Sequence, residues 1–201
     1  MIDLIKAYIK HIDQLYQTGV TTEHSFRGDL QKLLEDTTGY KVINEQKRID
    51  CGAPDLALYK NNVPYAYFEA KDLEVGDLDG RKKNKEQFDR YKASLNTIVF
   101  TDYLDFHLYE DGSLISKVEL AYIDKGHIRL NEEAVPHFIS MLEHLKMLKP
   151  QTISSPVRLA KIMASKARML ADAIEKVLAN DTYPSCENSS FSYCFSPPAS
   201  D

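Results

Sequence analysis

The first forty residues have the hydrophobic spacing of two helices. Between residues 2 and 17, apolar side chains recur at every third or fourth position, at Ile2, Ile5, Ile9, Ile12 and Leu15. Such spacing places them on one face of a helix. A second helix is predicted to begin at Thr21–Thr22, because a threonine can cap its first turn, and to end at Gly39.

The central part of the chain is typical of a sheet interrupted by one helix. Strands are predicted at 40–49, 54–59, 63–71, 97–102, 105–110 and 114–123, where β-branched, aromatic and alternating apolar residues gather. Asn61–Asn62 and Asp111–Gly112 have the composition of tight turns, and the first of them makes 54–71 a hairpin. A basic helix is expected at about 81–95.

The last third of the chain is predicted to be helical and then disordered. Helical spacing returns at 131–148 and at 155–180. The resulting order of elements predicts an α/β (α+β) fold with a mixed central sheet flanked by helices. Residues 181–201 contain no Lys or Arg and are rich in Ser and Pro, which predicts a disordered tail.

The composition is that of an ordinary globular protein, with 43% hydrophobic and 27% charged residues. No apolar run approaches the roughly 20 residues of a membrane span, and three scattered cysteines do not form a disulfide framework. We therefore expect a cytoplasmic protein without a membrane partner. The net charge is −5, but the segment 81–92 carries six basic and only two acidic residues. A solvated helix face and a phosphate-binding surface both have this pattern.

Three charged residues at the open end of the predicted hairpin are candidates for a reactive site. Asp55 begins one strand, and Glu69 and Lys71 end the other. Glu69 and Lys71 are two positions apart and so point to the same side of their strand. Pairing across the Asn61–Asn62 turn sets residues whose numbers sum to about 123 opposite each other, which brings Asp55 near Phe68 and Glu69.

Two neighbouring carboxylates suit a magnesium ion. Mg²⁺ prefers oxygen ligands and is commonly held by one or two carboxylates, and Mn²⁺ can substitute for it. Asp55 and Glu69 are the predicted ligands, with the backbone carbonyl of Ala70 as a third, and Lys71 is placed to assist a water molecule. A second acid-x-Lys triplet, Glu45-Gln46-Lys47, has no preceding acid at a matching distance and is interpreted as an exposed strand face.

These residues resemble a known signature. Pro54-Asp55, followed after thirteen residues by Glu69-Ala70-Lys71, resembles the PD-(D/E)xK motif of a nuclease superfamily. Gln87 and Tyr91, on the predicted basic helix, resemble the Gln-xxx-Tyr motif of a subset of these nucleases. Residues 22–35 are similar to the first core helix of single-chain restriction–modification enzymes. In those enzymes a nuclease precedes a helical connector and an adenine-specific methyltransferase.

The resemblance implies a restriction-endonuclease-like fold. Its nuclease core would span 20–130, between an N-terminal helix at 1–19 and the start of a helical connector at 131–180. It implies a Mg²⁺-dependent endonuclease that hydrolyses double-stranded DNA and leaves a 5′-phosphate. Gln87 and Tyr91 would support the substrate or Lys71. Target recognition and methylation are expected from regions downstream in a full-length enzyme, and cleavage of both strands from transient dimerisation on DNA.

One further acid is a candidate for completing the site. A helical projection of residues 22–35 places Glu23 on the inward face that Phe26 and Leu30 share, whereas Asp29 lies at the edge of that face. Glu23 is therefore the candidate for an additional metal or water ligand, matching the helix acid of the resembled nucleases. An acid at a helix start is also favoured by the helix dipole alone, so both interpretations stay open.

Two other functions stay open as well. A DNA-binding or assembly module without cleavage activity would have the same basic segment, and a nuclease of this fold can act on RNA or branched DNA. The tyrosines Tyr65, Tyr67 and Tyr91 suit base stacking, but aromatic residues of this kind also pack in cores.

Overall fold

The computed structural model describes residues 1–44, 49, 51–73, 78–79 and 84–148, and helical positions at 160, 163–164, 167–168, 170–175 and 178. The chain consists of two compact units, which are Met1–Ser165 and Lys166–Asp201. In chain order the elements are α1 (Ile2–Tyr16), α2 (Arg27–Thr38), β1 (Lys41–Asn44), β2 (Leu56–Lys60), β3 (Val63–Ala70), α3 (Lys85–Ser94), β4 (Thr97–Thr101), β5 (Asp105–Glu110), β6 (Ser113–Glu119), β7 (Ala121–Asp124), β8 (His127–Leu130) and α4 (Val135–Met147).

The predicted mixed sheet is confirmed. Strands β1 to β6 form one six-stranded sheet in chain order, and β7 and β8 form a separate two-stranded sheet. Within the larger sheet, β3 and β4 run parallel and the other neighbours are antiparallel. A parallel pair requires a crossover connection, and here that connection contains α3.

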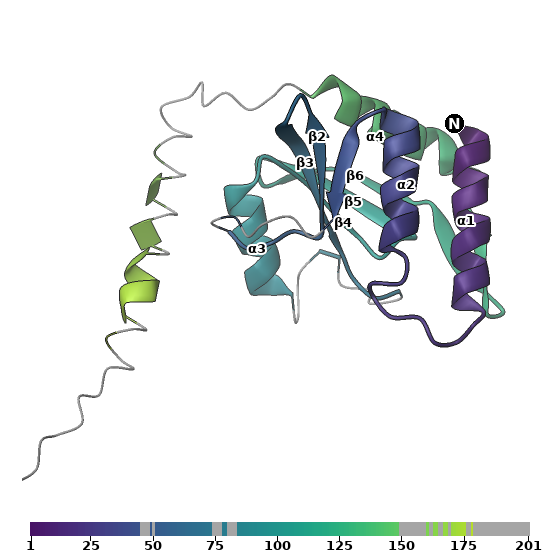
Figure 1. Ribbon diagram of the computed structural model, residues 1–201, viewed down its shortest axis with the longest axis horizontal. Coiled ribbons are helices and arrows are strands. Elements are labelled where there is room, and N and C mark those ends of the chain that lie inside the picture. Colours follow the sequence, from purple (N-terminus) through teal and green to yellow (C-terminus); the bar gives the residue numbers. More distant parts are fainter. Residues whose placement is uncertain are drawn as a thin grey trace, which may run out of the picture. The chain divides into compact units, whose positions relative to one another are not determined.

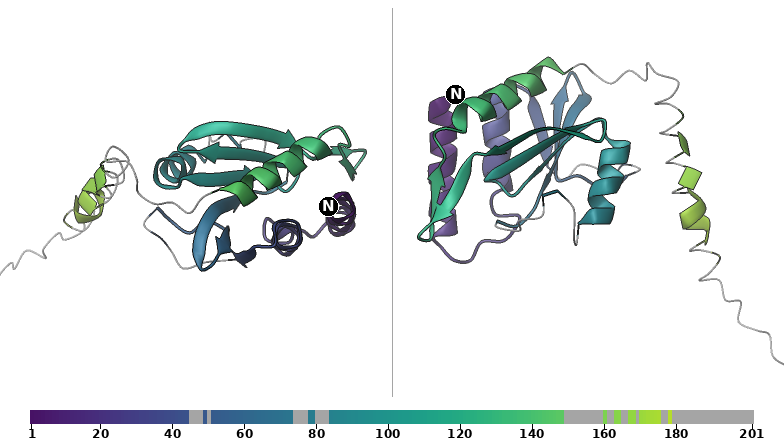
Figure 2. Two further views of the ribbon diagram at one scale, coloured as in Figure 1. Left: turned by 90° about the horizontal axis from the view of Figure 1, so that it is seen from above. Right: turned by 180° about the vertical axis from the view of Figure 1, so that it is seen from behind.

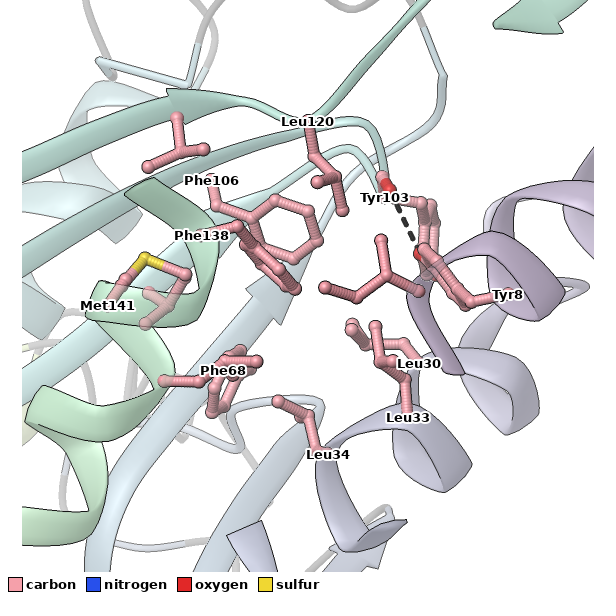
Figure 3. Close-up of a cluster of buried hydrophobic side chains, with 14 of the residues drawn as sticks. Tyr8, Leu30, Leu33, Leu34, Phe68, Tyr103, Phe106, Leu120, Phe138 and Met141 are labelled. Atoms are coloured by element: carbon pink, nitrogen blue, oxygen red, sulfur yellow. Dashed lines mark hydrogen bonds between the residues drawn. The ribbon is translucent and has the colours of Figure 1, made fainter. Parts of the chain in front are cut away.

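Alternating side chains on the strands face two separate hydrophobic clusters. On one face, Phe68 of β3 and Phe106 of β5 pack with the apolar sides of α1, α2 and α4 (Figure 3). On the other face, Phe100 of β4 stacks on Phe88 of α3, with ring centroids 3.8 Å apart. Helix α3 therefore covers the face of the sheet opposite to α1 and α2, and Figure 2 shows the sheet between them.

Helices α1 and α2 are antiparallel neighbours, joined by residues 17–26 (Figure 1). The predicted inward face of α1 is confirmed, because Ile5, Ile9 and Ile12 are buried. The Tyr8 hydroxyl of the same face donates a hydrogen bond of 2.9 Å to the carbonyl of Tyr103 (Figure 3). Gly39 ends α2 in the left-handed region, at φ 71°, as predicted.

The predicted start of α2 is wrong. Helix α2 begins at Arg27 rather than at Thr21–Thr22. Residues before it form a turn, in which the backbone N–H of Thr22 donates to Ser25 Oγ over 2.9 Å. The Tyr103 hydroxyl bonds to the carbonyl of Glu23, which in a helix would accept from Arg27. The contact between Tyr103 and Glu23 therefore stabilises a turn here relative to a helix.

The prediction of one strand at 114–123 is also wrong, because this segment forms two strands, β6 and β7. The backbone N–H of Leu120 donates to the carbonyl of Leu104 over 2.8 Å. After Glu119 the chain leaves the ladder with β5. The chain then enters β7, which pairs with the unpredicted strand β8 across a turn with positive φ at Lys125 and Gly126.

Several predictions fall outside the described residues. These are the tail at 181–201, the strand residues 45–48 with Glu45 and Lys47, and the basic residues 81–83. Of the helix predicted at 155–180, the described positions are helical. Among the described helices, none combines the length and the apolar character needed to cross a membrane.

Candidate active site

The hairpin of β2 and β3 has the predicted turn and register. Asn61 and Asn62 have φ of 51° and 62°, the left-handed values that a two-residue hairpin turn requires. Leu56 pairs with Phe68, after a shift in register between Leu58 and Tyr59. One position further along this ladder, Asp55 faces Glu69, so the hairpin brings the two predicted carboxylates together at its open end.

Asp55 is oriented by both of its carboxylate oxygens. Oδ2 accepts a hydrogen bond of 2.8 Å from the backbone N–H of Ala70 on the facing strand. Oδ1 accepts one of 2.5 Å from Nη2 of Arg27, the first residue of α2. The Asp55 side chain is 13% exposed, so it reaches the surface at the open end of the hairpin.

Glu69 is a buried carboxylate with two donors on one oxygen. Oε1 accepts from Lys71 Nζ and from Gln87 Nε2, each over 2.7 Å. Oε2 is buried and has no hydrogen-bond partner among the described residues. Burial raises the pKa of Glu69 from 4.5 to about 7, helped by the charges of Asp55 and Glu23 and opposed by Lys71.

Lys71 lies immediately beyond the end of β3, on the same side of the strand as Glu69. Its backbone N–H donates to the carbonyl of Thr101 over 2.8 Å, which continues the parallel ladder with β4 by one residue. Its ammonium lies 6.0 Å from the centre of the Phe88 ring of α3. The predicted placement of Glu69 and Lys71 on one side is therefore confirmed.

Helix α3 supports this site from the second face of the sheet. Gln87 contacts Glu69, and its Nε2 lies 3.5 Å from the Tyr91 hydroxyl. Tyr91 is only 1% exposed and packs against Gly52, three residues before Asp55, so it is not available for base stacking. Arg90 Nε donates to the carbonyl of Cys51 over 2.7 Å. The helix thus contacts both the strand of Glu69 and the turn that leads to Asp55.

Glu23 lies near the site, although it is not on a helix. Its Oε1 is 3.5 Å from Arg27 Nη2, and its charge contributes to the raised pKa of Glu69. Asp29 instead contacts His11 of α1, with Oδ1 2.5 Å from Nδ1. Of the two acids considered, Glu23 is therefore the one beside Asp55 and Glu69.

Arg27 is the residue of this cluster that the sequence did not reveal. It is buried, at 6% exposed, and links Glu23 to Asp55. An arginine at the border of the expected inward face, close to an acidic candidate, is the signal that could have identified it, since a buried acid needs a compensating charge.

In the described part of the basic segment 81–92, two of the basic side chains are engaged within the protein. Arg90 is bonded to Cys51, and Lys92 Nζ donates to the carbonyl of Asp79 over 3.2 Å. Lys85, at the start of α3, is exposed. Among the described residues of this segment, Lys85 is thus the basic residue best placed for a ligand in solution.

Comparisons with known proteins support the fold and leave the function to be proposed. No protein-family model matches the chain, and no curated protein matches it. A solved structure described as a cryoEM structure of a DrdV–DNA complex is similar, with a TM-score of 0.56 and 21% sequence identity. The match covers 74% of this chain and 100% of that chain. Together with the mixed sheet flanked by helices, it confirms a restriction-endonuclease-like fold.

Proposed function

We propose that this restriction-endonuclease-like chain is a Mg²⁺-dependent DNA endonuclease domain of a restriction–modification enzyme. The observation that carries the proposal is the convergence of Asp55, Glu69 and Lys71 at the open end of one hairpin. This is the arrangement that the PD-(D/E)xK signature requires. The structural similarity to a chain from a DNA complex supports DNA as the substrate.

The residues present fit a divalent cation. Glu69 Oε2 is a buried oxygen without a hydrogen-bond partner among the described residues, and a cation would satisfy it. Asp55 and the carbonyl of Ala70 would complete the protein ligands. No group of three or more His, Cys, Asp or Glu side chains suited to a metal occurs in the described ranges. Mg²⁺ does not need such a group, because it commonly keeps several waters and takes one or two carboxylates.

When bound, Mg²⁺ would acidify a water molecule and neutralise charge on the scissile phosphate. Lys71 Nζ, held by Glu69 over 2.7 Å, would orient that water and stabilise negative charge in the transition state. Gln87 would fix the Glu69 carboxylate through its 2.7 Å hydrogen bond. Tyr91 would act at a distance, by packing against Gly52 and thereby positioning the turn before Asp55.

The wider assignment follows from the resemblance. The substrate would be double-stranded DNA, cleaved to leave a 5′-phosphate, with target recognition and methylation supplied by downstream regions of a full-length enzyme. Transient dimerisation on DNA would bring two active sites to the two strands, so that both are cleaved together. Lys85 and the basic residues 81–83 are the candidates for phosphate contacts.

A second candidate, a DNA-binding module without cleavage activity, is favoured by one observation. Both oxygens of Asp55 already have partners within the protein, Arg27 and the N–H of Ala70. In such a module the ion pair of Asp55 with Arg27 would be permanent, and no metal ion would bind to Asp55.

Plasmid cleavage distinguishes the two candidates. Supercoiled DNA is incubated with the wild-type protein, Lys71→Ala and Asp55→Asn in Mg²⁺ or Mn²⁺, and DNA retardation is measured in parallel. Lys60→Ala is the matched control, because Lys60 is an exposed lysine at the other end of the same hairpin. We expect nicking by the wild type and Lys60→Ala and none by the other two. Retardation by all four proteins without cleavage would instead support the binding module.

A further inference from the structure

Arg27 is a buried cation at the centre of the acidic cluster. Its side chain is 8% exposed, and Nη2 lies 2.5 Å from Asp55 Oδ1 and 3.5 Å from Glu23 Oε1. A buried guanidinium is stable only when its charge is compensated, and carboxylates do this through charge-assisted hydrogen bonds. The arginine therefore occupies a position beside Asp55 where a divalent cation would experience its charge.

Arg27 also fixes the orientation of the predicted ligand. Asp55 Oδ1 accepts from Arg27 while Oδ2 accepts from the N–H of Ala70. With one donor on each oxygen, the carboxylate cannot rotate without losing a hydrogen bond. Each oxygen keeps a further lone pair, so a cation can be added to this arrangement without dismantling it.

The charges of the cluster are close to balance. Three carboxylates, of Glu23, Asp55 and Glu69, face the two cations Arg27 and Lys71, so the net charge is −1 when every group is ionised. Addition of a divalent cation changes this to +1, which matches one phosphodiester charge. Without Arg27 the cluster would carry −2, and the same cation would leave it neutral.

We propose that Arg27 is a positioning counter-ion, which holds Asp55 ready for a divalent cation and keeps the affinity for that cation low until a phosphate group binds. This inference rests on the proposed function. The positive charge of Arg27 would oppose the cation and favour the phosphate, because a cation held by Asp55 would lie beside the guanidinium in a partly buried site. The cation and the DNA phosphate also attract each other, so each would favour binding of the other, and linkage makes the two effects equal.

The test compares Arg27→Gln with Arg27→Lys, which keeps the charge. Arg129→Gln is the matched control, since it removes a charge from an exposed residue of β8. The Mn²⁺ dissociation constant is measured without DNA, from the electron paramagnetic resonance signal of free Mn²⁺. The affinity for a DNA duplex is measured in EDTA and in Mn²⁺.

We expect the Mn²⁺ dissociation constant of Arg27→Gln to fall by about tenfold or more, because the loss of a repelling charge at such short range outweighs the looser orientation of Asp55. Arg27→Lys and Arg129→Gln should stay within about threefold of the wild type. In EDTA, Arg27→Gln should bind the DNA duplex about tenfold more weakly than the wild type, because a charge that attracts the phosphate is lost. A purely structural arginine would give the opposite sign, since a loosened Asp55 binds Mn²⁺ more weakly.

An unchanged or higher dissociation constant in folded Arg27→Gln overturns the inference, while Mn²⁺ binding by the wild type leaves the proposed function standing. If neither protein binds Mn²⁺, both the inference and the proposed function fail. Should Arg27→Gln not fold, Arg27→Gln with Glu23→Gln restores the net charge. Its dissociation constant should lie within about threefold of the wild type, and a change beyond about tenfold would refute the charge argument.

Discussion

Glu69→Gln tests the electrostatics of the site, because it removes the charge of Glu69 at nearly constant shape. Glu69 has a pKa of 4.5 in an unfolded chain and about 7 in the folded protein, where burial disfavours its ionised form. Between these two pKa values the folded state binds the proton more strongly, so stability falls as pH rises. The full interval of about 2.5 pKa units corresponds to about 3.5 kcal/mol, at about 1.4 kcal/mol per pKa unit.

The assay is urea unfolding of both proteins in EDTA, at several pH values from about 5 to about 8. Wild type and Glu69→Gln share every other titratable residue, so the difference between their unfolding free energies isolates Glu69. As pH rises over this range, the unfolding free energy of Glu69→Gln should increase relative to that of the wild type by about 2–3 kcal/mol. A difference that stays constant with pH would refute the assigned cause, burial of an ionisable carboxyl group.

The same pair of proteins tests the link to the proposed cation. A cation at Glu69 must displace the proton, so the affinity of the wild type for Mn²⁺ should rise with pH up to about 7. Glu69→Gln should bind Mn²⁺ weakly at every pH. Equal binding by the two proteins would show that the cation lies elsewhere.

Two further substitutions test how α3 supports the site. Gly52→Ala should lower the free energy of unfolding by about 1–3 kcal/mol in urea denaturation, because Gly52 has φ 131° and an added Cβ would lie 3.0 Å from Tyr91. Gly28→Ala in α2, where a Cβ meets nothing within 4 Å, should instead be neutral or stabilising, and a loss as large as that of Gly52→Ala would contradict the steric argument. Gln87→Leu, which removes the 2.7 Å hydrogen bond to Glu69, should weaken Mn²⁺ binding in titration calorimetry by about 10–100-fold; unchanged binding would show that Gln87 does not orient the ligand.

The hairpin could be predicted from the sequence because its signals are local. Asn61 and Asn62 adopt positive φ, and alternation along the two strands fixes which residues share a side. These two facts are sufficient to bring Asp55 opposite Glu69. The shift in register at Leu58/Tyr59 changes the pairing by one residue only, within reach of the predicted contact.

The surroundings of the hairpin depend on contacts between distant residues, and there the prediction fails. The hydroxyl of Tyr103 binds the carbonyl of Glu23, eighty positions earlier, and this contact favours a turn where the local pattern favours a helix. The start of α2 at Arg27 then directs that side chain toward Asp55. Local propensity contains no information on either contact, so the sequence could mark Arg27 as a charge close to the inward face but could not identify Asp55 as its partner.

The placement of a divalent cation decides whether the cluster is a hydrolytic site. Crystals soaked in Mn²⁺ should show an anomalous peak within about 2.5 Å of the carboxylates of both Asp55 and Glu69. A peak elsewhere, or none at a saturating Mn²⁺ concentration, would contradict a metal-dependent nuclease. In that case Asp55 would keep its bonds to Arg27 and to the N–H of Ala70, and Glu69 its bonds to Lys71 and Gln87.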